Sequence, residues 1–331
     1  TIRKPIKKLY PFSKKKLKLK KYSSDVAIAT RKVYGETLAS LALANGNVLG
    51  IDAEVSNSTF SAELKKKTSK QFIEAFIAEQ NMLSVSLGLS KKGFRVFAST
   101  FSAFLSRAHD QIRMASLSDA NFVVCGSHSG VSIGEDGSSQ MGLEDISLFR
   151  SLNNSQVFYP SDALSAQKLT VAASKLSGIT YLRTSRPATF PLYSSSEKFN
   201  VGDFKILKQS KKDVAVFVGS GITVYEALKA HEAMGKKGIS VAVVDLYSIK
   251  PFNHAKFIRF VKKHGNKIVL AEDHRSEGGI GEMVAEGLVG KNISMKHLAV
   301  RKLSHSGTVD ELLERHKINS KAYLEGYKKL K

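Results

Sequence analysis

The sequence predicts an α/β protein of two domains, each built on a mainly parallel sheet flanked by helices. Length is the first observation, since 331 residues correspond to two domains at about 150 residues each. The second is the alternation, from residue 26 onward, of short β-branched or aromatic runs with helix-length segments, which is typical of parallel sheets. The third is the ordinary hydrophobic content of 42%, which excludes a disordered, collagen-like or coiled-coil chain.

Short apolar runs mark the expected strands, and the segments between them mark the helices. In the first domain, strands are expected at residues 48–51, 72–76, 94–98, 122–125, 157–159 and 180–182. Its helices are expected at residues 31–44, 80–89 and 163–177. In the second domain, strands are expected at residues 214–218, 241–246, 267–270 and 298–300. Apolar residues at helical spacing predict a helix over residues 223–234 of that domain.

Composition divides the chain into a basic N-terminal arm (1–24), a first domain (25–193), a polar linker (194–201) and a second domain (202–331). Residues 1–21 hold ten Lys or Arg and no acid, within a formal net charge of +22 for the chain. The arm is either a solvated extension or an attachment to an acidic partner surface or nucleic acid. Its aromatic residues are too few for a stacking platform, so nucleic-acid binding is unsupported.

Apolar runs and cysteine usage indicate the environment of the protein. The longest unbroken apolar runs, such as residues 214–218, reach about five residues, whereas a membrane span needs about 20. No apolar run follows the basic N-terminus, as one would in a signal peptide. The single cysteine, Cys125, excludes an internal disulfide and favours a reducing compartment. We therefore expect a soluble, cytoplasmic protein that does not contact a membrane.

Two segments at predicted strand ends carry candidate site residues. Glu79 lies between a strand and a helix, where a carboxylate is either a helix-capping acid or part of a site. Phe101 and Phe104 lie three residues apart at the start of another helix, either as core residues or as a wall for a planar group. Parallel sheets bind ligands at the carboxyl ends of their strands, so these positions favour a common site.

Two further loops carry polar and charged candidates. The loop at residues 126–140 is rich in Gly and Ser and holds His128, Asp136 and Gln140. Such a loop is poor material for a core and suits a polar site. Arg186 follows the next strand, where its guanidinium either forms a surface ion pair or binds a phosphate or carboxylate through two hydrogen bonds.

Together these segments resemble the transketolase family over about residues 25–330. One such motif would be weak support, whereas many in the same order are strong support. The motifs are similar to those of vertebrate-type transketolases rather than to those of the bacterial and yeast enzymes. In order, they are IATRKVYG (28–35), NSTF (57–60), IAEQNM (77–82), STFSAF (99–104), DQIRM (110–114), GSHSGVSIGEDGSSQM (126–141), FYPSD (158–162), RTSRP (183–187), VGSGIT (218–223), IKP (249–251), EDH (272–274) and GGIG (278–281).

The resemblance implies transfer of a two-carbon ketol unit from a ketose phosphate to an aldose phosphate with thiamine diphosphate, a reaction of the pentose phosphate pathway. Complete transketolases also carry an N-terminal domain that binds the diphosphate and its metal through a Gly-Asp-Gly motif and a later Asn. Here the only Asp-Gly pair, Asp136-Gly137, lacks that context. The chain is therefore expected to be the C-terminal half of a split transketolase, with its pyrimidine-binding and C-terminal domains and no metal ligand of its own.

An N-terminal transketolase subunit is the partner that this resemblance implies. That subunit would hold the diphosphate together with Mg²⁺ or Ca²⁺, while this chain would bind the pyrimidine side of the cofactor. Transketolases place the cofactor in a cleft between domains of different polypeptide copies. We therefore expect two copies of this chain, joined by a two-fold contact, to assemble with two copies of the partner into a heterotetramer.

The resemblance assigns the pyrimidine side of thiamine diphosphate to Glu79, Phe101, Phe104 and Arg107. Glu79, as a catalytic residue, would hydrogen-bond a ring nitrogen of the aminopyrimidine. The two phenylalanines would pack against the pyrimidine ring and exclude water. Arg107 occupies a position where some relatives carry a third aromatic residue, which would leave this wall less complete.

The phosphorylated sugar is assigned, by the same resemblance, to a second group of polar residues. Cations and hydroxyls around a phosphate dianion form charge-assisted hydrogen bonds. Asp136 would bind a sugar hydroxyl near the cleaved bond, and His128 would also be catalytic. Gln140 replaces a histidine of the bacterial and yeast enzymes, as in the vertebrate type. The full substrate-binding set is Arg31, Ser58, His128, Asp136, Gln140 and Arg186.

Other functions remain open from the sequence. The β subunits of 2-oxoacid dehydrogenases and 1-deoxyxylulose-5-phosphate synthase share this domain architecture, although the RTSRP and GSHSGVSIGEDG loops favour a phosphosugar enzyme. A non-catalytic role in assembly or nucleic-acid contact through the basic arm is a further alternative. In the second domain, residues 219–221 (GSG) precede a helix, a pattern that suits an anion cradle.

Overall fold

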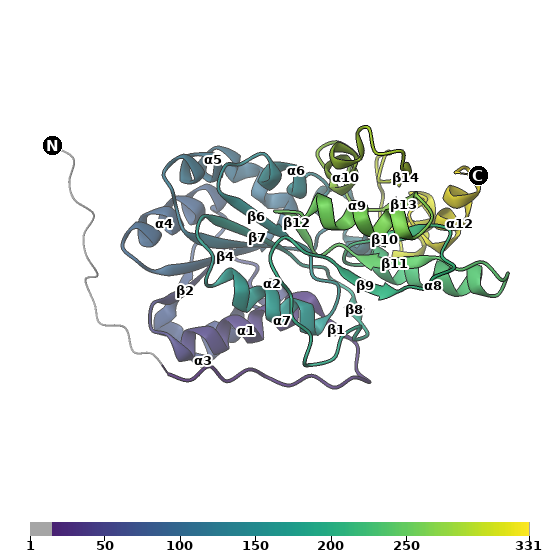
Figure 1. Ribbon diagram of the computed structural model, residues 1–331. Coiled ribbons are helices and arrows are strands. Elements are labelled where there is room, and N and C mark those ends of the chain that lie inside the picture. The colour runs from purple at the N-terminus through teal and green to yellow at the C-terminus, as the bar shows by residue number, and fades with distance from the viewer. Residues whose placement is uncertain (1–14, 331) are drawn as a thin grey trace.

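The computed structural model describes residues 15–330, so residues 1–14 of the predicted arm lie outside the described residues. Two sheets, each flanked by helices, lie side by side along the chain (Figure 1). Among residues 15–330, every helix is too short or too polar to cross a lipid bilayer. The α/β class and the mainly parallel sheets predicted from the sequence are confirmed.

The first sheet has seven strands in the order β12-β6-β7-β5-β4-β2-β3, and all pairs but β12–β6 are parallel. Its strands are apolar because helices cover both faces. Along β5, for example, Phe122 and Val124 pack on one side, while Val123 and Cys125 pack on the other. The strands are β2 (Val48–Asp52), β3 (Phe72–Glu74), β4 (Arg95–Phe101), β5 (Phe122–Ser127), β6 (Ser155–Phe158), β7 (Ile179–Arg183) and β12 (Ser248–Lys250).

Helices α1, α3 and α7 lie against one face of this sheet, and α4, α5 and α6 lie against the other (Figure 1). Helix α7 starts with a capping box, in which Asp162 accepts from the Ser165 backbone N–H and the Ser165 side chain bonds back to Asp162. The helices are α1 (Thr30–Ala44), α2 (Ser56–Thr59), α3 (Ala62–Lys67), α4 (Glu79–Lys91), α5 (His109–Leu117), α6 (Asp145–Arg150) and α7 (Ala163–Ala173). Short 3₁₀ helices are η1 (Ser69–Gln71), η2 (Ser102–Ala108), η3 (Val131–Asp136) and η4 (Ser138–Gln140).

The second sheet has five strands in the order β14-β13-β10-β11-β9, with β9 antiparallel. The prediction of a strand at 298–300 was wrong, because the edge strand β14 is the more polar segment Ser294–Leu298. The chain leaves the sheet after β14, and the Val300 N–H donates to the His274 carbonyl instead. The strands are β9 (Lys205–Lys208), β10 (Val216–Gly219), β11 (Ala242–Asp245), β13 (Lys267–Ala271) and β14. The helices are α8 (Thr223–Gly235), α9 (His254–Lys263), α10 (Ile280–Leu288), α11 (Val309–Arg315) and α12 (Ser320–Lys328).

The two sheets are not independent units. Strand β12, which comes from the second half of the chain, pairs antiparallel with β6 at the edge of the first sheet. A small antiparallel ribbon joins β1 (Ile28–Ala29), at the start of the first domain, to β8 (Ala188–Thr189), at its end. Residues 194–201 form no helix or strand, yet the Phe199 ring packs edge-on against Tyr193 and Tyr247. The segment predicted as a linker is therefore held in place by aromatic contacts.

A buried ion network joins the two halves at the end of β7. The Arg183 guanidinium is fully buried and pairs with Asp145 and Asp273, each at 2.8 Å. Tyr159 donates to the second oxygen of Asp273 at 3.0 Å, and its ring lies under the guanidinium. Burial alone would raise the pKa of Asp145, but the charges of Arg183 and His274 outweigh it and lower that pKa. Asp273 belongs to the second half, so this network fixes one half against the other.

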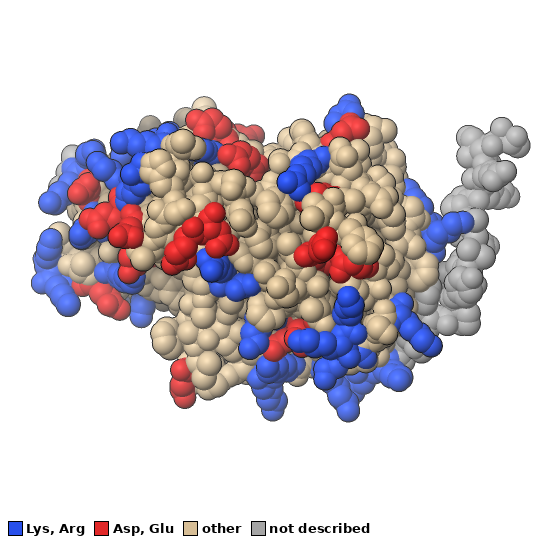
Figure 2. Space-filling view, turned by 180° about the vertical axis from the view of Figure 1, so that it is seen from behind, with Lys and Arg blue, Asp and Glu red and all other residues tan. Residues whose placement is uncertain are grey.

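The described part of the basic arm packs along the first domain through a few side chains, while its lysines are exposed. Leu17 packs against the core under α1 and α7, and the Tyr22 hydroxyl donates to Glu36 at 2.9 Å. Lys20 also pairs with Glu36 at 2.7 Å, while its carbonyl accepts from Gln167 at 2.8 Å. Figure 2 shows Lys and Arg side chains gathered along the lower edge of the first domain, where Figure 1 places α3 and this N-terminal segment.

We predict that Arg183→Met lowers the free energy of unfolding by about 3–5 kcal/mol, because it leaves two buried carboxylates without their shared cation. Urea denaturation measures the loss. The matched control is Lys256→Ala, which breaks the more exposed pair with Asp203 (2.7 Å) and is expected to cost less than about 1 kcal/mol. Equal losses in the two variants would contradict a structural role for the network.

Candidate active site

The predicted site residues gather at the carboxyl edge of the first sheet. Strands β2, β4, β5 and β7 are parallel neighbours, so the segments that follow them emerge at the same edge. Strand β4 ends at Phe101 and is followed by Phe104, the loop after β5 carries His128, and the segment after β7 carries Arg186. This is the edge at which parallel sheets bind ligands.

Glu79 is the first residue of α4 and is only 3% exposed. As the acid in the first turn of α4, Glu79 makes no hydrogen bond to the helix backbone within residues 15–330. Instead, Oε1 accepts from Arg107 Nη1 at 2.9 Å. The other oxygen, Oε2, has no hydrogen-bond partner among residues 15–330. The helix N-terminus still favours a negative charge at this position.

An aromatic stack lies beside Glu79, and the three-residue spacing of its members explains how it forms. After Phe101 the chain turns into the 3₁₀ helix η2, which has three residues per turn, so Phe104 and Arg107 follow on the same side. The rings of Phe101 and Phe104 are stacked with centroids 5.2 Å apart, and the Arg107 guanidinium lies 5.1 Å from the Phe104 centroid. The sequence predicted a less complete wall because Arg107 replaces a third aromatic residue. In the structure the Arg107 guanidinium lies over the Phe104 ring and extends the stack.

Phe101 also stacks on the His128 ring, with centroids 3.9 Å apart. Phe101 is 6% exposed yet is part of none of the apolar clusters formed by the described residues, which favours a site wall over a core residue. The stack therefore runs from His128 through Phe101 and Phe104 to Arg107, which holds Glu79.

His128 is held as a neutral imidazole. It lies in the left-handed backbone region with a φ of 57°, which non-glycine residues rarely adopt, and its Nδ1 is 2.9 Å from the Ser127 hydroxyl. Burial, together with the positive charges of Arg31 and Arg186, lowers the pKa of His128 to about 3. At neutral pH this histidine acts as a hydrogen-bonding group rather than a cation.

Two arginines supply the positive charge of the site. Arg31, at the start of α1, donates to the Ser58 carbonyl at 2.6 Å, and its buried Nε has no hydrogen-bond partner. Burial and the nearby charge of Arg186 lower the pKa of Arg31. Arg186 donates to the Ile133 carbonyl and pairs with exposed carboxylates of η3, Glu135 at 3.2 Å and Asp136 at 3.5 Å.

The structure thus brings together nine of the ten predicted site residues through contacts or electrostatic coupling. Ser58 contributes its carbonyl to Arg31 rather than a side-chain contact. Gln140 ends η4, four residues after Asp136, but within residues 15–330 its side chain forms no hydrogen bond to the others. Its place in the site remains a prediction.

Asp52 is a site-forming residue that the sequence analysis missed. It ends β2, is fully buried, and accepts from the hydroxyls of Thr59 at 2.6 Å and Ser61 at 2.8 Å. Burial raises its pKa to about 6. These bonds fix the short α2 segment that carries Ser58. The sequence feature that could have identified Asp52 is an acid directly after the apolar strand run at residues 48–51 (VLGI).

Residues 219–221 of the second domain do not form the predicted anion cradle. A side chain at Gly221 would collide with the Tyr159 ring, and the Ser220 hydroxyl donates to the Leu246 carbonyl at 2.8 Å. The Ser220 backbone N–H bonds Thr223 Oγ1 at 3.0 Å. The loop is therefore filled by contacts between the two halves of the chain.

We predict that Arg186→Ala raises the pKa of His128 from about 3 toward its ordinary value of 6.5, because one of the positive charges that disfavour protonation is removed. NMR titration of the labelled imidazole measures this pKa. The exposed Arg259 of α9 provides the control, and Arg259→Ala is expected to leave the titration unchanged. A wild-type imidazole that protonates between pH 6 and 7 would contradict the assigned environment.

Two family models match consecutive parts of the chain. The transketolase pyrimidine-binding domain matches residues 26–190, and the transketolase C-terminal domain matches residues 202–322. Among curated proteins, the chain is 48% identical over 300 residues to transketolase-like protein 1 of Bos taurus and 43% identical over 314 residues to transketolase of Homo sapiens. These alignments cover 90% and 94% of this chain but 50% of each relative. The chain therefore spans about half the length of the curated relatives it matches.

Solved structures agree with this division. A split gene transketolase, solved as an inactive beta4 tetramer, is 32% identical with a TM-score of 0.83, and the match covers 91% of this chain and 98% of that one. Transketolase from Leishmania mexicana is 25% identical with a TM-score of 0.78, and the match covers 93% of this chain and 46% of that one. The pyrimidine-binding and C-terminal domains are thus both present, and the chain belongs to the transketolase family.

Proposed function

We propose that this chain supplies the pyrimidine-binding side of a transketolase active site and transfers two-carbon ketol units between phosphorylated sugars. The observation that carries the proposal is the buried Glu79 beside the stack of Phe101 and Phe104, at the same sheet edge as His128, Arg31 and Arg186. One part of the site is suited to an aromatic cofactor, and the other is suited to a phosphorylated substrate.

The residues present fit thiamine diphosphate on its pyrimidine side. A planar heterocycle would pack against the stack of Phe101 and Phe104, and the Phe104 ring is the half-buried member of the two. Glu79 Oε2 is the carboxylate atom left to share a proton with a ring nitrogen, because Arg107 occupies Oε1. When bound, the cofactor supplies the electron sink that carbon–carbon cleavage next to a carbonyl requires.

The arginines and the histidine fit a phosphorylated sugar. A phosphate dianion would compete with the exposed Glu135 for Arg186 and would satisfy the unpaired Nε of Arg31. His128 is held neutral, so it donates or accepts one hydrogen bond without adding charge near the cleaved bond. Asp136, already near Arg186, is suited to bind a sugar hydroxyl, with Gln140 nearby in the sequence.

The partner that we propose is an N-terminal transketolase subunit that holds the diphosphate and Mg²⁺ or Ca²⁺, in a heterotetramer of two copies of each. The likeness to a split gene transketolase, of which this chain covers 98%, supports a divided enzyme, and the beta4 assembly of that protein supports self-association of this chain. Two apolar side chains that precede Glu79 are exposed, Phe76 to 65% and Ile77 to 72%. Exposed apolar side chains of this kind are typical of a surface that a partner subunit covers. Cytoplasmic location is part of the same proposal.

The rival functions have less support. A 2-oxoacid dehydrogenase subunit has no need for two arginines placed for a sugar phosphate. A purely structural protein would have no need for a buried Glu79 or a neutral His128. Glycolaldehyde transfer measured against pyruvate decarboxylation, with the N-terminal half present, separates these enzymes.

We predict that Glu79→Gln lowers ketol transfer by about 10²–10⁴-fold, because an amide cannot exchange the proton that the cofactor's activation requires. The assay uses the chain mixed with the N-terminal half of a transketolase, and native mass measurement checks assembly. The control is Glu63→Gln on the surface of α3, which is expected to retain full activity. Near-normal turnover by the Glu79 variant in an intact assembly would remove Glu79 from this role.

We predict that Arg186→Ala raises KM for a phosphorylated ketose by roughly 10- to 150-fold, the equivalent of losing one charged hydrogen bond worth about 1.5–3 kcal/mol. KM for unphosphorylated hydroxypyruvate is expected to change little. Steady-state kinetics with both donors, with Arg259→Ala as the control, make the comparison. Equal increases for the two donors would mean that Arg186 shapes the loop rather than binds phosphate.

A further inference from the structure

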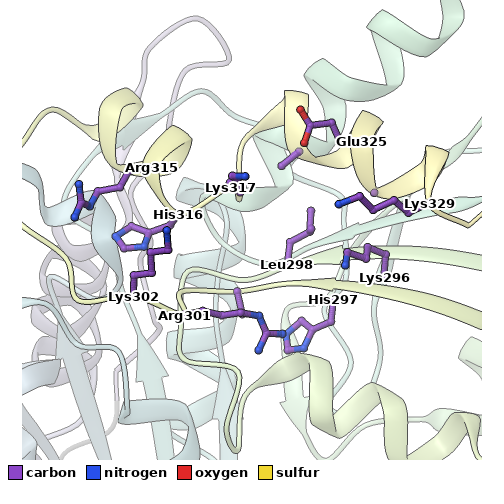
Figure 3. A pocket seen from close by; sticks show the side chains of 13 residues that line it. Lys296, His297, Leu298, Arg301, Lys302, Arg315, His316, Lys317, Glu325 and Lys329 are labelled. Atoms are coloured by element: carbon purple, nitrogen blue, oxygen red, sulfur yellow. The ribbon is translucent and has the colours of Figure 1, made fainter.

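A basic pocket lies in the second domain, far along the chain from the candidate active site. It is enclosed by the edge strand β14, the segment that follows it, the end of α11 and the helix α12. Its volume is about 260 Å³, at the lower end of the size of small-molecule sites. Figure 3 shows Lys302, Arg315 and His316 on one side, Lys296 and Lys329 on the other, and Leu298 between them.

The lining of this pocket carries a large excess of positive charge. Its lining includes Lys296, Arg301, Lys302, Arg315, Lys317 and Lys329, against the single carboxylate of Glu325. Throughout the described chain, these six cations form no ion pair with a carboxylate; Arg301 donates only to the Ser276 hydroxyl, at 2.9 Å. Like charges repel, so clustering them around a cavity without counter-ions favours an anion there.

His316 provides an independent observation. This pocket-lining residue is 6% exposed, and its Nε2 is 3.0 Å from the hydroxyl of the buried Ser304. Its Nδ1 is buried with no hydrogen-bond partner, whereas buried polar atoms in native proteins are normally paired. The pKa of His316 is lowered, first by burial and then by the nearby charges of Arg315, Arg275, His305 and Lys302. An anion in the pocket would offset this positive field.

The size and chemistry of the lining select among anions. Leu298, Ala299 and Ala322 give the floor a small apolar surface, which suits the carbon part of a small molecule. No Phe, Tyr or Trp lines the pocket, so it lacks the rings on which nucleic-acid bases stack. Several cations converging on one small volume match a phosphate group better than a monovalent carboxylate.

We propose that this pocket binds a small phosphate-bearing anion, a phosphate monoester or diphosphate, at a site separate from the sheet edge of the first domain. The binding does not depend on the proposed ketol transfer, since none of its residues belongs to that site. Lys302 and Arg315 hold the phosphate from one side and Lys296 and Lys329 from the other, with the His316 ring in the wall beside them.

Calorimetric titration of the full chain with inorganic pyrophosphate tests the proposal. The titrations use an Arg31→Ala, Arg186→Ala background, so that the candidate active site does not contribute. We expect saturable binding that Lys302→Glu with Arg315→Glu weakens at least tenfold. Lys328→Glu, a charge reversal on the exposed side of α12 outside the pocket, is the control and is expected to bind normally.

Two further measurements keep the test independent of folding. Lys296→Gln with Lys329→Gln removes charge without reversing it and is expected to weaken binding as well, with an unchanged circular dichroism spectrum. Pyrophosphate is also expected to shift the His316 imidazole NMR signal and to raise its pKa. The proposal is overturned if the full chain does not bind pyrophosphate, if Lys328→Glu weakens binding as much as the pocket variants, or if only single-stranded RNA binds in a pocket-dependent way.

Discussion

The arrangement of the molecule depends on one buried cation. Arg183 ends the inner strand β7 with its guanidinium wholly out of water, so it requires carboxylate partners, and these come from both halves of the chain. Asp145 comes from the start of α6 and Asp273 from the loop after β13. Gly130 approaches Asp273 so closely that a side chain there would meet its carboxylate, which ties the His128 loop to the same network. The active-site loop is therefore positioned by the interface between the halves.

The site itself is organised by a second constraint, the three-residue repeat of η2. An α-helix at residues 102–108 would rotate Phe104 and Arg107 away from Phe101, because its turn contains 3.6 residues. The tighter 3₁₀ turn keeps the three side chains in line and delivers Arg107 to Glu79. The buried acid is thus held through Oε1 by a residue on the neighbouring segment, and its Oε2 forms no hydrogen bond within residues 15–330.

The parallel strands of the first sheet and several residues of the candidate site were predictable from the sequence. The parallel strands of the first sheet are continuous apolar runs, so they stand out, and loops at their carboxyl ends identified Glu79, His128 and Arg186. Strand β14 was misplaced because an edge strand of alternating polarity has no such run. Three features could not be predicted because they depend on contacts between segments about 60 to 110 residues apart, which local sequence patterns do not encode. These are the pairing of β12 with β6, the role of Arg183, and the packing of the Tyr159 ring against the loop at residues 219–221.

Strand β12 has a mechanical consequence. Because it is inserted at the rim of the first sheet while its flanking residues belong to the second half, backbone hydrogen bonds cross between the halves as well as side chains. A hinge rotation would have to break that ladder and expose Arg183 to solvent at the same time. Access to the sheet edge is therefore governed by local loops rather than by rotation between the halves, and we expect the two halves to unfold as a single cooperative unit.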